Sequence, residues 1–179
     1  MSTYNSSIEN ENSSFISTVY NYDWSSTLLG PMELWDSSLK NAVNLSLQSV
    51  FPACICICPN WTFLYNEAYL PILKTKHPYA LGKTVKEVWP EIYEIISSEL
   101  ERQVVVRVTG KGIFKKDVLF ELQRDGYIEE AYFNYTFSPI LKSDGTVCAV
   151  LTFAQEITQR VLIGRRFKIL GEFGCRVSG

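Results

Sequence analysis

Three cysteines at alternate positions, Cys54, Cys56 and Cys58, have the residue type and the close spacing of a metal or redox site. Alternate side chains of a β-strand lie in a row roughly 6.5 Å apart, whereas zinc sites usually gather thiolates around one ion at short turns. A redox role would need a lowered thiol pKa, and no Lys or Arg lies within several residues of the three in the sequence. The pattern therefore favours a buried strand with small packed side chains. Replacing the three with Ala or Val should cost stability and leave function largely intact.

The sequence has one histidine, His77, which is followed by Pro78. Nucleophilic catalysis by a Ser–His or Cys–His pair would have to use this residue, and a haem iron could take it as a ligand. A histidine before proline is typical of a turn, so we expect neither role. The carboxylates Asp125, Glu129 and Glu130 lie at an expected hairpin turn, where charge is usually solvated. We therefore predict no catalytic residue, no metal ligand and no enzyme activity in this chain.

The composition indicates a globular domain and excludes several partners. The chain has 179 residues, 46% of them hydrophobic, which is enough for a domain with its own core. A formal net charge of -2 provides no basic surface for nucleic acid or an anionic membrane. The longest apolar run, Val50 to Cys58, is interrupted by Pro52 and is about half the length of a membrane span. We expect a cytoplasmic protein that binds neither nucleic acid nor membrane, with its five cysteines reduced.

The N-terminal segment differs in composition from the rest. Residues 1–21 contain ten Asn or Ser, and their few apolar side chains cannot offset the chain entropy lost on folding. We therefore predict a disordered Asn/Ser-rich tail over residues 1–21. A folded domain over 22–156 and a linker or exit helix over 157–179 should follow.

Apolar spacing in the first half predicts a helix followed by a hairpin. Four residues, four apart, share the inner face of that helix: Trp35, Leu39, Val43 and Leu47. The cysteine segment and residues 62–65 should pair as antiparallel strands. A short helix over residues 66–73, capped by Asn66, is expected next. Pro90 then suits the first turn of a longer helix that ends near Leu100.

The second half alternates with the period of β-strands. It predicts three consecutive antiparallel strands, over residues 114–124, 130–138 and 146–153. Helical spacing returns from Glu156, with Ile163, Phe167 and Leu170 on one stripe. That stripe could form a dimer seam or pack on the sheet. Five antiparallel strands with helices on one face indicate the α+β class.

Six sequence motifs, in their order along the chain, resemble the PAS domain family, and most closely the N-terminal PAS module of sensor histidine kinases. They span residues 22–162: DWSSTLLGPMELWDSSL, FPACICICPNWTFLYNEAY, KHPYALGK, EVWPEI, RDGYIEEAYFNYTFSPILKSDGTVCAVL and EITQRV. The resemblance implies a five-stranded antiparallel sheet with short helices forming a concave pocket over one face. An N-terminal helix and a C-terminal exit helix complete this PAS-like arrangement.

Modules of this family sometimes hold haem, flavin or a small metabolite. The flavin photochemistry of the family uses a Gly-x-Asn-Cys word, which this sequence lacks, and His77 is the single histidine available to a haem. Haem and flavin are therefore disfavoured as cofactors, and the sequence does not identify another cofactor. The kinase domain and the phosphate-accepting histidine of such proteins are absent from this chain, so autophosphorylation is not expected.

The default ligand site is a pocket between the sheet and the helices. Aromatic side chains should line it, with two asparagines as polar handles, although each aromatic could equally belong to the core. The candidate ligand-binding residues are Tyr65, Asn66, Tyr69, Trp89, Phe120, Asn134 and Tyr135.

The sequence therefore predicts a sensory input or ligand-binding module in signal transduction. It would form part of a sensor histidine kinase phosphorelay and relay a change through its C-terminal helix to a downstream signalling module or kinase. A homodimer through that helix is expected. The alternative is a module that senses nothing and binds a protein partner through the outer face of its sheet.

Overall fold

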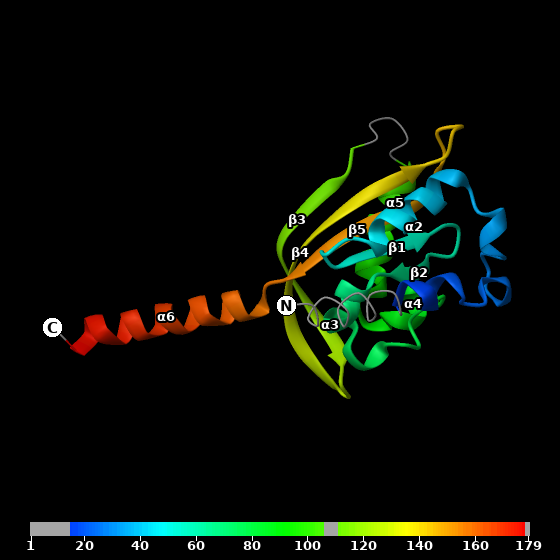
Figure 1. Cartoon of the computed structure of the whole chain (residues 1–179). Helices are drawn as coiled ribbons and strands as arrows, with labels where there is room; N and C mark the ends of the chain where they lie inside the picture. The colour runs from blue at the N-terminus through cyan, green and yellow to red at the C-terminus, as the bar shows by residue number, and fades with distance from the viewer. Residues whose placement is uncertain (1–14, 106–110, 178–179) are drawn as a thin grey trace, which may run out of the picture.

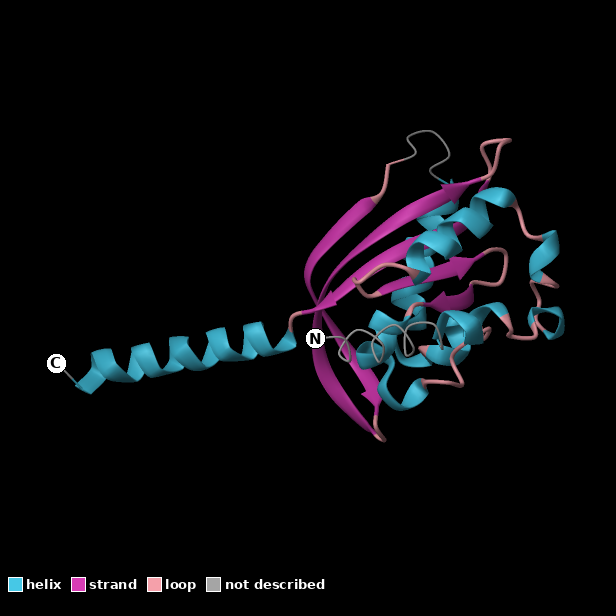
Figure 2. Ribbon diagram, viewed as in Figure 1, coloured by secondary structure: helices cyan, strands magenta, loops and turns pink. Residues whose placement is uncertain are grey.

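The computed structural model of the chain describes residues 15–105 and 111–177. It contains one five-stranded antiparallel sheet of order β2-β1-β5-β4-β3, with several short helices, which is the predicted α+β class. The strands are β1 (Ala53–Ile57), β2 (Thr62–Tyr65), β3 (Ile113–Arg124), β4 (Tyr127–Leu141) and β5 (Val147–Glu156). The first hairpin and the later meander share this sheet because β1 pairs with β5, as Figure 2 shows.

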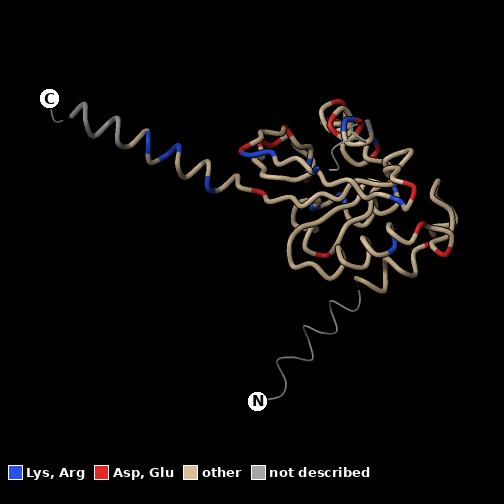
Figure 3. Tube along the Cα trace, turned by 90° about the horizontal axis from the view of Figure 1, so that it is seen from above, with Lys and Arg blue, Asp and Glu red and all other residues tan. Residues whose placement is uncertain are grey.

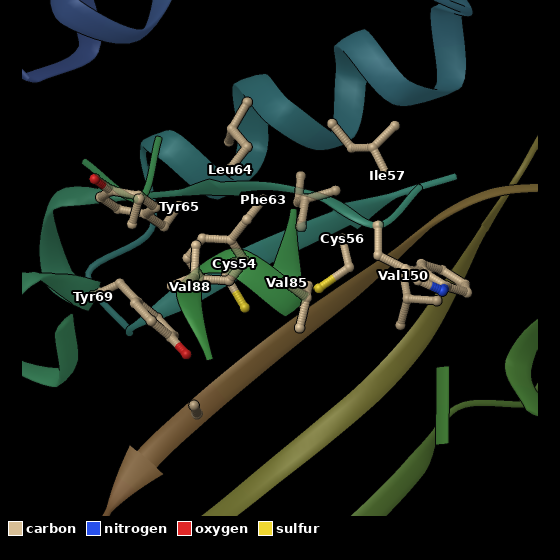
Figure 4. Close-up of a cluster of buried hydrophobic side chains, with 14 of the residues drawn as sticks. Cys54, Cys56, Ile57, Phe63, Leu64, Tyr65, Tyr69, Val85, Val88 and Val150 are labelled. Atoms are coloured by element: carbon tan, nitrogen blue, oxygen red, sulfur yellow. The ribbon is translucent and has the colours of Figure 1, made fainter. Parts of the chain in front are cut away.

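The cysteine strand β1 is buried over its whole length. Cys54 and Cys56 point to one face of the sheet, and Ile57 points to the other together with Leu64 of β2 (Figure 4). The alternation thus arises from a strand covered on both faces, with thiols on one side and branched aliphatic side chains on the other. Cys58 lies just beyond the strand and is half-buried. The prediction of small packed side chains is confirmed for Cys54 and Cys56.

Three helices over residues 24–47 precede β1, and the last of them packs against β1, β4 and β5 of the sheet. They are η1 (Trp24–Ser26), η2 (Met32–Leu34) and α2 (Ser37–Leu47). The predicted apolar face of α2 is confirmed for Leu39, Val43 and Leu47, which are all buried, but Trp35 precedes the helix as the C-cap of η2. The Asp36 side chain accepts a hydrogen bond of 2.8 Å from the Ser38 N–H and so caps the first turn.

The other short helices lie between β2 and β3 and cover the inner face. They are η3 (Glu67–Tyr69), α3 (Leu70–Leu73), η4 (Lys74–Lys76), α4 (Val85–Val88), η5 (Pro90–Ile92) and α5 (Tyr93–Val105). A capping box between Thr84 and Glu87 begins α4. Pro90 opens η5, and α5 runs past the predicted end near Leu100 through Val104 to Val105. Val104 packs against the hydrophobic core, and this packing outweighs the weak helix propensity of valine.

The exit helix α6 (Thr158–Val177) leaves the sheet at the end of β5 and projects away from the domain (Figure 1). Its stripe of Ile163, Phe167 and Leu170 is exposed, with Phe167 at 70%. Of the two arrangements left open by the sequence, packing on the sheet is therefore excluded within this chain. None of the helices in the described part of the chain combines the length and apolar character needed to cross a membrane.

The predicted disordered tail was wrong for its last residues. Residues 15–20 are helical, and Phe15 and Val19 are buried. These two side chains, four residues apart, lie on one face of the helix and pack on the domain, so the few apolar residues of the segment suffice to hold it. The rest of the predicted tail, residues 1–14, lies outside the described residues.

Candidate functional site

A small cavity of about 70 Å³ lies between the inner face of the sheet and the covering helices. The sheet supplies Cys54 and Cys56 from β1 and Thr152 from β5. Strand register places Cys54 directly opposite Thr152, so both side chains point to the cavity face. The helices and the remaining strands add apolar and aromatic walls: Phe63, Tyr69, Ile72, Val85, Trp89, Ile92, Ile96, Phe120, Leu122, Phe133, Tyr135, Phe137 and Ala154.

Four of the seven predicted site residues line this cavity, namely Tyr69, Trp89, Phe120 and Tyr135. Tyr69 comes from η3, and Figure 4 shows it pointing to the same side of β1 as the Cys54 thiol. Phe120 and Tyr135 stack as neighbours from β3 and β4, with ring centroids 5.8 Å apart. Alternation along β3 and β4 therefore placed Phe120 and Tyr135 in the cavity wall, because it determines which strand residues face inward.

Tyr65 lies outside the cavity, which corrects its assignment. Its hydroxyl is 2.9 Å from Nδ1 of His77, and the ring of Phe15 packs 5.8 Å from its own. Burial raises the pKa of Tyr65 above its ordinary value, with the nearby Tyr22 as a smaller cause. Tyr65 and His77 thus attach the helix at residues 15–20 to the domain. The turn role expected for His77 is accompanied by this structural one.

Asn66 is a buried structural residue and not a ligand handle, which corrects two predictions. Its amide donates to the carbonyl oxygens of Ser46, Ser49 and Phe51 at 2.8 to 3.0 Å, and its oxygen accepts from the Ala53 N–H at 3.0 Å. It makes no side-chain cap on the helix that follows. The chain between α2 and β1 has few ladder bonds of its own, so Asn66 satisfies these backbone groups.

Asn134 faces away from the cavity, so its assignment was also wrong. Its side-chain oxygen accepts a 2.9 Å hydrogen bond from the N–H of Asp117, a residue at φ 53° where the register of β3 shifts. Asn134 alternates with Tyr135 on β4 and therefore occupies the opposite face. The polar handles expected for a ligand are thus both used on backbone groups.

Three ionisable side chains at the cavity, Tyr69, Cys56 and Tyr135, are held in their neutral forms. Burial raises the pKa of Tyr69 well above its ordinary value, and the neighbouring Cys54 and Cys56 raise it further. A hydrogen bond with Cys54 and then burial raise the pKa of the Cys56 thiol. Burial, with Glu99 as a smaller cause, raises the pKa of Tyr135 to about 12. The cavity therefore presents hydroxyl and thiol groups without charge.

Arg124 is a second feature of the site, and sequence reasoning missed it. Although 1% exposed, it donates to Glu156 at 2.9 and 3.1 Å, to Glu129 at 2.7 Å and to the carbonyl oxygen of Ile72 at 3.1 Å. The prediction of solvated charge was wrong for Glu129, which also contacts Lys74 at 2.7 Å. The available signal was alternation: Phe120, Leu122 and Arg124 share the inward face of β3.

Comparison with known proteins found matches among solved structures. No protein-family model and no curated protein matches the chain. Among solved structures, the PAS domain of Bordetella pertussis BvgS aligns over 76% of this chain and 98% of its own length, at 19% identity and a TM-score of 0.54. This chain has a PAS fold.

Other solved structures agree with this assignment. The PAS domain of a protein from Colwellia psychrerythraea aligns over 68% of this chain and 98% of its own, at 14% identity and a TM-score of 0.50. Phage VqmA in its complex with DPO aligns over 75% of this chain and 59% of its own, at 15% identity and a TM-score of 0.50. At these identities the likeness concerns the fold, so the function of this PAS domain has to be argued from its own residues.

The cysteines that the structure describes do not gather with other possible metal ligands. Within the described part of the chain, no group of three or more His, Cys, Asp or Glu residues could hold an ion. The N–H of Cys58 donates to the carbonyl oxygen of Cys148 at 2.9 Å, which continues the pairing of β1 with β5. Cys54, Cys56, Cys58 and Cys148 are all free thiols.

Proposed function

We propose that this PAS domain is a sensory input module, in which a change in the cavity is relayed to the exit helix α6. The observation that carries the proposal is the position of Arg124. One guanidinium nitrogen, Nη1, contacts both Ile72, whose side chain lines the cavity, and Glu156, the last residue of β5. A buried cation with two such contacts couples the positions of both groups.

The first turn of α6 continues this chain of contacts. Thr158 donates through its hydroxyl to Glu156 at 2.9 Å, and the same oxygen accepts from the Tyr132 N–H at 3.0 Å. Arg165, two turns further on, lies over the Tyr132 ring at 5.0 Å. A shift of Ile72 would therefore move the acceptors that fix the origin of α6. Since α6 otherwise projects from the domain, a small change at its origin alters its direction.

The proposal also includes the signalling system to which the domain would belong. We propose a cytoplasmic module of a sensor histidine kinase phosphorelay, supported by the sequence motifs over residues 22–162. We propose no catalytic role for the chain itself, because its single histidine, His77, lies outside the cavity and contacts Tyr65. The complex of phage VqmA with DPO is a precedent for a bound partner molecule in a protein of this fold. A homodimer along the exposed stripe of α6 would pass the signal on.

Hydrogen exchange of the whole chain tests the relay. Cys56→Met adds a flexible side chain that can fill the cavity, because methionine adapts to irregular space. Leu64→Met is the matched control, since Leu64 is equally buried but points to the other face of the sheet. We expect Cys56→Met to change the exchange of amides 158–162, and Leu64→Met to leave it unchanged. Adding Arg124→Met should abolish the response. A folded Cys56→Met protein with unaltered exchange in α6 would contradict the proposal.

The alternative role as a partner-binding module also has an observation in its favour. A hollow of about 400 Å³ lies on the outer side of the sheet, and the exposed rings of Phe51, Phe114 and Phe153 line it. If the domain binds a protein partner and senses nothing, Phe114→Ser should weaken association of the domain with that protein. Cys56→Met should then leave the hydrogen exchange of α6 unchanged. Sedimentation and hydrogen exchange on the same variants therefore separate the two functions.

A further inference from the structure

The cavity is lined by a buried hydroxyl group that has no hydrogen-bond partner in the described part of the chain. Thr152 is 6% exposed, lines the cavity from β5, and its Oγ1 has no partner among the described residues. The other buried threonine of the sheet, Thr62, shows no such unsatisfied atom. Buried polar groups are nearly always paired, because an unmade hydrogen bond costs stability. An unpaired hydroxyl that faces a void is therefore a position at which an incoming molecule can bond.

The rest of the lining excludes charged molecules. Of the described residues that line the cavity, none is Asp, Glu, Lys, Arg or His. Two cations beside the lining are already paired. Arg124 bonds two carboxylates and a carbonyl oxygen, and Lys76, 4.3 Å from the Trp89 ring, pairs with Glu91 at 3.0 Å. A carboxylate or ammonium group entering here would lose its hydration without gaining a counter-charge. The walls instead offer aliphatic and aromatic surface, with neutral thiol and hydroxyl groups beside Thr152.

The cavity volume favours a small ligand. About 70 Å³ is roughly half of the engineered apolar cavity of ~150 Å³ that binds benzene. A haem or a flavin would require the core to open, whereas a single ring requires the walls to move slightly. Ile72, Ile92 and Ile96 lie on the short helical segments that cover the sheet, which are the walls that can yield.

We propose that the ligand of this domain is a small uncharged molecule, no larger than about one ring, with an apolar body and one polar group that bonds the Thr152 hydroxyl. This inference rests on the proposed sensory function and names the class of molecule sensed. Strand pairing fixes Thr152 against Cys54, so the polar group of the ligand lies against β1 and β5. Its apolar body lies toward Ile72, from which the contact with Arg124 begins.

Binding measurements with three matched probes test the class. Phenol and toluene have the same size and differ by a hydroxyl, and benzoate adds a charge. The test variant is Thr152→Val, which keeps the shape and removes the hydroxyl. Thr136→Val is the control, because Thr136 lies on the outer face, where its Oγ1 accepts from the Phe153 N–H at 3.2 Å.

Calorimetry and methyl NMR of the whole chain should give a defined pattern. Phenol should bind the wild type about tenfold more tightly than Thr152→Val, the effect expected for one buried hydrogen bond. Toluene should bind both proteins equally, benzoate should bind neither, and Thr136→Val should behave as wild type. Without any probe, Thr152→Val should have a raised Tm, since it removes an unpaired buried hydroxyl. This last result also excludes a bound water that satisfies Thr152.

Three results would overturn the proposal: benzoate binding in the cavity, phenol affinity that Thr152→Val does not change, or no binding of phenol at about 10 mM. Failure of the ligand class is distinguishable from failure of the relay. If no probe binds but Cys56→Met still alters exchange in α6, the class is wrong and the sensory function stands. If phenol binds through Thr152 while α6 does not respond, the ligand class stands and the relay is wrong.

Discussion

Arg124 and Glu156 form a bidentate ion pair, with nitrogen to oxygen distances of 2.9 and 3.1 Å. They end β3 and β5, two strands that do not pair with each other in the sheet. The arginine side chain is fully buried, whereas the carboxylate is partly exposed. The pair therefore ties the far edge of the sheet to the origin of α6. Bidentate pairing also fixes the orientation of the guanidinium group relative to the carboxylate.

Removing the buried cation should destabilise the domain. Arg124→Met leaves Glu156 without its arginine partner and Glu129 with Lys74 alone, and loss of one member of a buried pair typically costs about 3 kcal/mol or more. Arg160→Met is the control, because Arg160 is exposed and its ion pair with Asp117 should contribute less than about 1 kcal/mol. Urea unfolding measures both. Equal losses in the two variants would show that the buried position of Arg124 contributes nothing.

The same pair predicts a dependence of stability on pH. Burial alone would raise the pKa of Glu156, but hydrogen bonds from Arg124 and Thr158 outweigh it and hold that pKa below its ordinary value. A carboxyl with a lowered folded pKa stabilises the fold above its unfolded pKa of about 4.3, and this contribution is lost as the pH falls through the folded value. We expect wild-type stability to fall below about pH 4. Glu156→Gln should show a shallower fall, measured by urea unfolding from pH 7 downward.

Asn66 and Asn134 were both predicted to bind the ligand, but their replacement should change the free energy of unfolding by different amounts. Asn66 is fully buried and bonds four backbone groups, so Asn66→Ala should lower the free energy of unfolding by about 3 kcal/mol. Asn134→Ala removes one bond near the surface and should cost about 1 kcal/mol or less. Neither should change the affinity for phenol by more than about twofold. A loss of affinity in Asn134→Ala would return that residue to the site.

The thiols should react according to their burial. Burial, then the nearby Cys148, raises the pKa of Cys58 to about 11, so its thiolate is scarce at neutral pH. Iodoacetamide should modify half-buried Cys58 slowly, at a rate that rises roughly tenfold per pH unit toward that pKa. Cys54 and Cys56 should stay unmodified until the protein unfolds. Peptide mass mapping reads each site, and rapid labelling of Cys56 in the folded protein would oppose its packing role.

The proposed dimer depends on the exposed stripe of α6. Phe167→Glu places a charge on that stripe and should dissociate the dimer. Lys168→Glu introduces the same side chain one position further along the helix, away from the stripe, and should leave the dimer intact. Figure 3 shows that basic residues are spaced along α6, so the control also tests whether their charge matters. Sedimentation velocity measures both, and a monomeric wild type would exclude this seam.

Local pattern was sufficient to predict most elements of the fold. The spacing of Leu39, Val43 and Leu47 predicted α2, and the alternation around Phe120 and Tyr135 predicted β3 and β4. Both periods report which side of an element is buried, and this information lies within a few residues of chain. The same alternation identified Phe120 and Tyr135 only as inward or core aromatics, and both line the cavity, as do Tyr69 and Trp89 from the helical segments.

Tertiary structure alone decided the partner of each polar group. Asn66 had the residue type of a helix cap, yet the carbonyl oxygens of the loop before β1 lie within its reach. Arg124 and Thr152 have nothing unusual in their local sequence, and their roles depend on contacts with Glu156 and with the cavity. Burial converts a polar side chain into one that must find a partner, and which partner is near depends on segments far apart in the chain. Sequence therefore determined the periodic framework, and only the packed structure determined the site.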